Sequence, residues 1–326
     1  MKYNSLKNIA DNFDVFLFDA YGVFWEGNGF YEGSREMMAS LVNAGKTVVV
    51  ISNTTMLGPD IRANYAQRGL FEHKEYSYMY TSGDLLRQCL VGGDLTFKSC
   101  PNPLKYYVIG LPHKKAFADT KYQQVSLLEE ADFVYCGVPF MFAEDVEKYP
   151  QYQELYWPVR KNAQGQIEFW DTLTEKPFEE IVQKAVDLGL PALNANPDFT
   201  AREGHPLVPN SEAVFVVRNG TIAEMFRQRN AEVIEFGKPH ANIYEYVFKM
   251  LAKEGIAVDK ARTCMIGDTV RTDVKGALVA GVTPVLCVET GVVAEDIQNG
   301  KTLESLCQAE KIDVQQIVQI KRVGEI

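Results

Sequence analysis

The chain has 326 residues, 46% of them hydrophobic, which predicts roughly two globular domains that bury a core without disulfides or a structural metal. Its formal net charge of −10 argues against a broad nucleic-acid surface, and its apolar runs fall far short of the ~18 residues of a membrane span. The six cysteines form no Cys-x-x-Cys pair and the first eight residues contain no apolar signal segment, so we expect reduced thiols and a cytoplasmic protein.

Strands alternate with helices in the first part of the chain. Short apolar runs that end at polar residues predict strands over residues 13–18 and 47–51. The spacing of apolar residues predicts a helix over residues 33–44, and a Gly-Pro-Asp sequence begins a second helix over residues 58–68. This order is typical of a parallel sheet covered by helices.

The middle of the chain has a different pattern. Aromatic-rich runs predict strands over residues 106–109 and 133–137, a helix follows over residues 177–187, and turn signals are frequent. We interpret residues 103–205 as a smaller α/β domain inserted into the first one.

The last part of the chain returns to alternating strands and helices. We predict strands over residues 232–236, 263–266 and 284–288, and helices over residues 242–254 and 274–280.

Together the two terminal segments predict one doubly wound parallel α/β sheet covered on both faces. We assign residues 1–102 and 206–326 to this core domain, with the smaller domain inserted between them.

Four polar residues follow predicted strands: Asp19, Ser52, Lys238 and Asp268. The carboxyl ends of parallel strands lie at one edge of a sheet, where ligands bind, so these side chains are expected to converge. Each alone is weak evidence, because Asp and Ser at such positions are commonly caps or turn residues. Four such residues at predicted strand ends together indicate a functional site.

Their chemistry fits phosphoryl transfer, which needs a nucleophile, cationic charge and fixed hydrogen-bond donors. Asp19 is the candidate nucleophile, and with Asp268 it supplies the carboxylates that Mg²⁺ prefers, with Asp273 supporting. Lys238 is suited to hold the phosphate as a point charge.

Hydrogen-bond donors to the phosphate are expected where the second predicted strand, residues 47–51, ends. The Ser52 hydroxyl and the Asn53 amide are suited to bind phosphate oxygens there.

Four stretches of the chain resemble the four motifs of the haloacid dehalogenase superfamily. They are residues 16–25 (FLFDAYGVFW), 50–54 (VISNT), 236–240 (FGKPH) and 265–273 (MIGDTVRTD). Ser52 follows Asp19 by 33 positions, which leaves no room for an inserted domain, whereas Lys238 follows Ser52 by 186 positions. The long interval between the second and third motifs leaves room for a large α/β cap. In this the chain is similar to the subgroup of nitrophenyl-phosphatase, phosphoglycolate-phosphatase and pyridoxal-phosphatase-like proteins.

The resemblance implies several further properties. It implies a Rossmann-like core, a cap that selects the substrate, Mg²⁺ as cofactor and a small phosphorylated metabolite as substrate. It implies neither a nucleic-acid nor a membrane partner, and it leaves a homodimer open. The segments 81–83 (TSG) and 196–198 (NPD) also resemble this subgroup. For Asp198 a turn residue is the simpler interpretation, and a contact with substrate is the alternative.

Tyr21 departs from the pattern, because phosphatases of this family carry an Asp two residues after the nucleophile. That Asp protonates the leaving alcohol, a contribution of roughly 10²–10⁴-fold. The Tyr21 carbonyl still suits a metal ligand, and its phenol suits a proton donor better than a base. We therefore assign Asp19, Tyr21 and Lys238 to catalysis.

Asp-Ala-Tyr-Gly at residues 19–22 also resembles the true 2-haloacid dehalogenases, whose halide leaves without a proton. Those proteins place a helical cap between the first two motifs and lack the metal-binding Asp of the fourth, unlike this chain. We therefore rank a Mg²⁺-dependent phosphatase first. A phosphate-ester-binding protein with little turnover comes second, and dehalogenation third.

Overall fold

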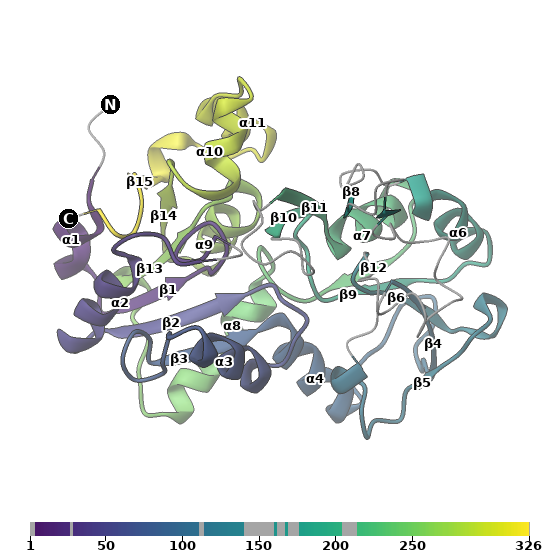
Figure 1. The fold of residues 1–326 in the computed structure, drawn as a ribbon. Coiled ribbons are helices and arrows are strands. Elements are labelled where there is room, and N and C mark those ends of the chain that lie inside the picture. The colour runs from purple at the N-terminus through teal and green to yellow at the C-terminus, as the bar shows by residue number, and fades with distance from the viewer. Residues whose placement is uncertain are drawn as a thin grey trace.

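The chain forms two parallel β-sheets that lie side by side (Figure 1). The computed structural model describes residues 4–26, 29–110, 114–139, 160–161, 167–168, 176–203 and 214–325. None of the helices in these ranges is long and apolar enough to cross a bilayer.

The first sheet has six parallel strands in the order β15-β14-β13-β1-β2-β3. Their bounds are β1 Val15–Phe18, β2 Thr47–Ser52, β3 Tyr78–Thr81, β13 Thr263–Gly267, β14 Thr283–Cys287 and β15 Val318–Ile320. β1 is central: Val15 lies opposite Thr47 on one side and Thr263 on the other. This order is that of a doubly wound sheet, as predicted.

Alternate residues of β1 pack on opposite faces, because strand side chains alternate. Leu17 belongs to a cluster with α4, α8 and α9, whereas Phe16 belongs to a cluster with α1 and α2. Helices therefore cover both faces of the first sheet. Their bounds are α1 Leu6–Ile9, α2 Ser34–Asn43, α3 Gly58–Gln67, α4 Ser82–Gly92, α8 Ala241–Lys253, α9 Lys275–Ala280, α10 Gly291–Gln298 and α11 Leu303–Ala309.

The second sheet has five parallel strands in the order β12-β9-β6-β4-β5. Their bounds are β4 Lys105–Ile109, β5 Gln123–Gln124, β6 Phe133–Cys136, β9 Ala192–Asn194 and β12 Val233–Glu235. Helices α6 (Lys176–Asp187) and α7 (Asn219–Gln228) pack on one face through apolar residues such as Phe178 and Phe226. We call residues 105–235 the inserted unit.

Two short antiparallel pairs complete the described strands of the inserted unit. β7 (Arg160–Lys161) pairs with β8 (Ile167–Glu168), and β10 (Thr200–Glu203) pairs with β11 (Val214–Val217). β10 lies close to the first sheet (Figure 1).

The α/β class is confirmed, but one strand lies in a different sheet from the one we predicted. Residues 232–236 were predicted as a strand of the core domain, whereas β12 pairs with β9 in the second sheet. The predicted boundary at residues 205 and 206 therefore cuts through the inserted unit, and the chain returns to the first sheet only after Glu235. Sheet membership is set by this long-range pairing, which the local apolar pattern does not encode.

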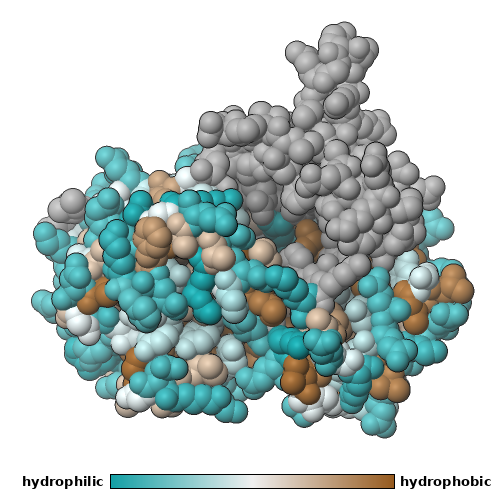
Figure 2. Space-filling model, turned by 60° about the horizontal axis from the view of Figure 1, so that its bottom comes forward, coloured by the Kyte–Doolittle hydropathy of each residue, from teal (hydrophilic) through white to brown (hydrophobic). Residues whose placement is uncertain are grey.

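Apolar residues on the outer surface are dispersed. Figure 2 shows apolar residues standing singly or in small groups among hydrophilic ones on the face that it presents. Exposed large apolar side chains such as Phe71, Val91 and Leu127 come from separate elements, which is ordinary for a globular protein.

Candidate active site

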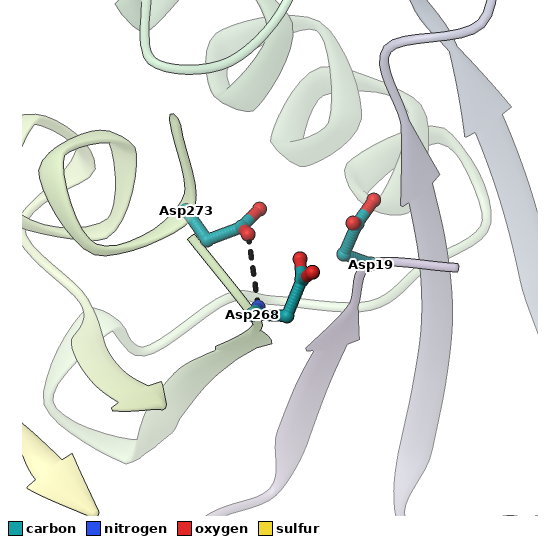
Figure 3. A group of neighbouring side chains, drawn as sticks. All are labelled: Asp19, Asp268 and Asp273. Carbon is teal, nitrogen blue, oxygen red and sulfur yellow. Dashed lines mark hydrogen bonds between the residues drawn. The ribbon is translucent and has the colours of Figure 1, made fainter. Parts of the chain in front are cut away.

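Three carboxylates meet at the carboxyl end of the first sheet. Asp19 directly follows β1 and Asp268 directly follows the neighbouring strand β13. Asp273 lies on the π-helical turn Val270–Val274 and faces both (Figure 3). One ligand oxygen from each of the three lies within 4.8 Å of the other two. The expected convergence of the first and fourth motifs is thus present in the geometry.

Backbone amides fix the orientation of two of these carboxylates. Asp273 Oδ2 accepts hydrogen bonds from the amides of Asp268 (3.1 Å) and Thr269 (3.0 Å). Asp268 Oδ2 accepts one from the amide of Val292 (2.7 Å), at the start of α10. Burial raises the pKa of Asp268 well above its usual value, and the nearby Asp273 and Asp19 add to this. Such a cluster is stabilised by a cation.

A glycine allows the chain to pass close to Asp268. Gly22 has φ +78°, and a Cβ added there would lie 2.0 Å from Asp268 Oδ2. Only a residue without a side chain fits between the first motif and this carboxylate. The glycine after Tyr21 is therefore required by the shape of the site.

Lys238 places a buried ammonium against the carboxylates. Its side chain is 2% exposed, and Nζ lies 2.6 Å from Asp19 Oδ1 and 2.7 Å from Asp273 Oδ1. Burial lowers the pKa of Lys238, but the two carboxylates outweigh this and raise it, so the ammonium stays charged. Burial raises the pKa of Asp19 to about 7, with Lys238 opposing.

Asn53 connects the second motif to Lys238 and to the inserted unit. Its Oδ1 accepts a hydrogen bond from the Lys238 amide (2.7 Å), and its Nδ2 donates to the Lys238 carbonyl (3.0 Å). The same Nδ2 donates to Asp198 Oδ1 (2.9 Å). We expected only the backbone amide of Asn53 to matter; its side chain is the link between these segments.

Ser52 lies at the end of β2, beside Asn53, and is 8% exposed. Its Oγ accepts a hydrogen bond from the Thr54 amide (3.3 Å). This contact uses the oxygen only as an acceptor, so the hydroxyl keeps its own proton to donate.

A cleft of about 490 Å³ opens beside the carboxylates and lies between the first sheet and the inserted unit. Asp19, Tyr21 and Asp268 line it on one side, and Asp198 and Phe199 line it on the other. Tyr21 is thus in the cleft, next to the candidate nucleophile.

Arg271 joins the fourth motif to the inserted unit. Its guanidinium lies 3.4 Å from the centroid of the Phe199 ring and donates to the Pro197 carbonyl. No local sequence pattern indicates this contact, because the two residues are 74 positions apart. Arg218, buried near Tyr21 and Asp198, was missed for the same reason.

Comparisons with known proteins agree with this geometry. A family model described as haloacid dehalogenase-like hydrolase matches residues 16–119, and one described as HAD-hydrolase-like matches residues 235–308. Chronophin of Bos taurus is 26% identical to this chain, over 88% of this chain and 85% of its own length. The 4-nitrophenylphosphatase of Schizosaccharomyces pombe is 23% identical, over 89% of this chain and 88% of its own length. A haloacid dehalogenase-like hydrolase of Brucella suis has a similar fold, with a TM-score of 0.69, 23% identity and 98% of each chain covered.

Proposed function

The chain belongs to the haloacid dehalogenase superfamily, and from this premise we propose that it is a phosphatase that hydrolyses a small phosphomonoester with Mg²⁺ through an aspartyl phosphate. The observation that carries the proposal is the contact of the buried Lys238 ammonium with Asp19 and Asp273, beside Asp268. The similarity to 4-nitrophenylphosphatase of Schizosaccharomyces pombe supports the same reaction class.

In the proposed first step, an oxygen of Asp19 attacks phosphorus and the alcohol leaves. Lys238 holds the phosphate oxygens as their charge develops, and Ser52 and the Asn53 amide donate hydrogen bonds to them. Water then hydrolyses the aspartyl phosphate and regenerates Asp19. The inserted unit acts as the cap that closes over the cleft and selects the substrate.

The donor set suits Mg²⁺. Carboxylate oxygens are hard ligands, and three of them from Asp19, Asp268 and Asp273 lie within 4.8 Å of one another. We propose that Asp19, Asp268 and the Tyr21 carbonyl hold the ion, with Asp273 supporting. When bound, the ion supplies positive charge that orients the phosphate and offsets its negative oxygens.

The second candidate function rests on the presence of Tyr21 in place of the usual acid. A phenol is a poor substitute for the usual carboxylic acid, so a phosphate-ester-binding protein with little turnover is the alternative. Dehalogenation ranks third, because a cluster of three carboxylates beside an ammonium suits a phosphate dianion better than an alkyl halide.

The proposed activity is tested by phosphate release from nitrophenyl phosphate, sugar phosphates and pyridoxal phosphate. We expect turnover with Mg²⁺, loss with EDTA and recovery when Mg²⁺ is restored, because the carboxylates need the cation to accept a phosphate dianion. Binding of these esters without turnover would instead identify the alternative function. Halide release from 2-haloacids without metal would identify the third.

The metal role of Asp268 is tested with Asp268→Asn. We expect the Mg²⁺ concentration for half-maximal activity to rise by at least about 10–100-fold, the range seen when even an outer partner of a metal site is lost. Asp296→Asn is the matched control, since Asp296 also lines the cleft but pairs with Lys301 outside the cluster. An unchanged Mg²⁺ requirement in Asp268→Asn would remove this residue from the metal site.

A further inference from the structure

We propose that Asp198, from the inserted unit, is the acid that protonates the leaving alcohol and then the base that activates water. This assignment rests on the proposed phosphatase function. It addresses the gap left by Tyr21, which stands where the usual acid is expected.

The loop at residues 196–198 is held against the active site by contacts on both sides. The Asp198 amide donates to Asn196 Oδ1 (3.1 Å), which closes a local turn. Arg271, from the fourth motif, donates to the carbonyl of Pro197. The carboxyl group of Asp198 is therefore fixed relative to the first sheet as well as to its own unit.

One oxygen of this carboxyl group is held by a hydrogen bond, and the residue lines the cleft. Oδ1 accepts from Asn53 Nδ2 at 2.9 Å, and the same amide nitrogen lies 3.0 Å from the Lys238 carbonyl. Oδ2 accepts no hydrogen bond from the residues that the structure describes. Asp198 lines the cleft together with Asp19 and Tyr21, so a phosphate held at Asp19 places its leaving group in the same space.

The surroundings of Asp198 favour a carboxyl that carries a proton. Burial raises its pKa, and Asp273 adds to this, whereas Lys238, Asn53 and Arg271 oppose it. Asp19 and Arg218 are both near enough to interact electrostatically with Asp198, and the charge of Asp198 contributes to the raised pKa of Asp19. A general acid works best when its pKa is near the working pH.

Other acids in the cleft are placed less well for this role. Asp296 is paired with Lys301 at 2.8 Å and Glu310 with Lys275 at 2.7 Å, both beside α10 and α11. Among the described residues, neither forms a hydrogen bond with the second or third motif, whereas Asp198 is bound directly to Asn53.

The two steps balance in atoms and electrons. As the Asp19 oxygen bonds to phosphorus, the bond from phosphorus to the alcohol oxygen breaks, and that oxygen takes its electron pair and the proton of Asp198. The Asp198 carboxylate next removes a proton from water, whose oxygen attacks phosphorus and displaces the Asp19 carboxylate. Phosphate leaves, and both residues return to their starting states.

The test compares a good and a poor leaving group in Asp198→Asn, which keeps an oxygen to accept from Asn53 but has no acidic proton. For glycerol phosphate we expect kcat/KM to fall by on the order of 10²-fold or more, because an alkoxide needs a proton to leave. For nitrophenyl phosphate we expect kcat/KM to stay within a few fold, because nitrophenolate leaves without one. We also expect a burst of nitrophenolate stoichiometric with enzyme, followed by slow turnover, because water is no longer activated.

Three further variants keep the result interpretable. Glu26→Gln, which alters another acid of the cleft, should leave both substrates unaffected. Tyr21→Asp in the Asp198→Asn background should restore glycerol phosphate hydrolysis by supplying an acid beside Asp19. Tyr21→Phe tests the phenol as the alternative proton donor, because it removes only the hydroxyl and keeps the backbone carbonyl.

The opposite results overturn the assignment. Equal loss of kcat/KM on both substrates in Asp198→Asn, or no loss on either, removes Asp198 as the acid while the phosphatase function stands. A leaving-group-dependent loss in Tyr21→Phe but not in Asp198→Asn assigns the proton to the phenol. If the wild-type protein releases phosphate from neither substrate, the proposed function fails and the role of Asp198 fails with it.

Discussion

Replacing Asp19 with Asn is expected to lower phosphate release by on the order of 10⁴–10⁶-fold, the range observed when one member of a catalytic triad is removed. An amide does not attack phosphorus, so no aspartyl phosphate forms on this chain. Asn is close in size to Asp and still accepts a hydrogen bond from Lys238 Nζ, which lies 2.6 Å from Asp19 Oδ1. Steady-state phosphate release and trapping of the phospho-enzyme measure the effect.

The stability of this variant provides a control with a defined sign. Burial raises the pKa of Asp19 from 3.8 to about 7. A carboxyl whose pKa is raised on folding lowers the free energy of unfolding as pH increases from its unfolded pKa to its folded pKa. This loss of stability is fully present at pH values above the folded pKa. Without added metal at pH 8, Asp19→Asn should therefore melt no lower than the wild-type protein. Activity that persists in a folded Asp19→Asn protein would rule out Asp19 as the nucleophile.

Replacing Lys238 with Met is expected to reduce both stability and activity. The ammonium is the buried cation between Asp19 and Asp273, and removing one partner of a buried ion pair costs about 3–5 kcal/mol. We expect the destabilisation to be larger at pH 8 than at pH 5, because protonation of the carboxylates relieves their repulsion. Phosphate release should fall by roughly 10²–10³-fold, as when one donor to a developing oxyanion is lost.

Two comparisons separate this effect from a general loss of packing. Mg²⁺ should recover part of the stability of Lys238→Met, because the cation offsets the same carboxylates. Lys275→Met is the matched control, since Lys275 is 43% exposed and its ion pair with Glu310 is worth about 1 kcal/mol or less. Equal melting-temperature changes in the two variants would contradict the structural role given to Lys238.

Local sequence patterns were sufficient to predict the strands that lead to two of the three carboxylates. The apolar run that becomes β1 ends directly at Asp19, and the run that becomes β13 ends one residue before Asp268. Because parallel strands carry such residues to one edge, their convergence followed from general rules. The π-helical turn that brings Asp273 back to the Asp268 amide was not among the predicted elements.

Contacts between distant segments were not predictable in the same way. Asn53 and Asp198 are 145 positions apart, and their hydrogen bond depends on how the inserted unit meets the first sheet. The strand Val233–Glu235 is short and only partly buried, so its apolar residues do not identify its partner strand. The start of α10, whose Val292 amide holds Asp268, has no motif that links it to the fourth-motif carboxylate.

The two chain crossings between the sheets differ greatly in length. The outward crossing runs from the end of α4 at Gly92 to β4 at Lys105, whereas the return runs from Glu235 to α8 at Ala241 and contains Lys238. A rotation of one sheet relative to the other would have to bend this short return crossing, which contains Lys238 and its contacts with Asp19 and Asp273. We therefore expect movement between the two sheets to shift the Lys238 ammonium, the proposed phosphate-binding group, whereas the longer outward crossing can change shape without moving a proposed site residue.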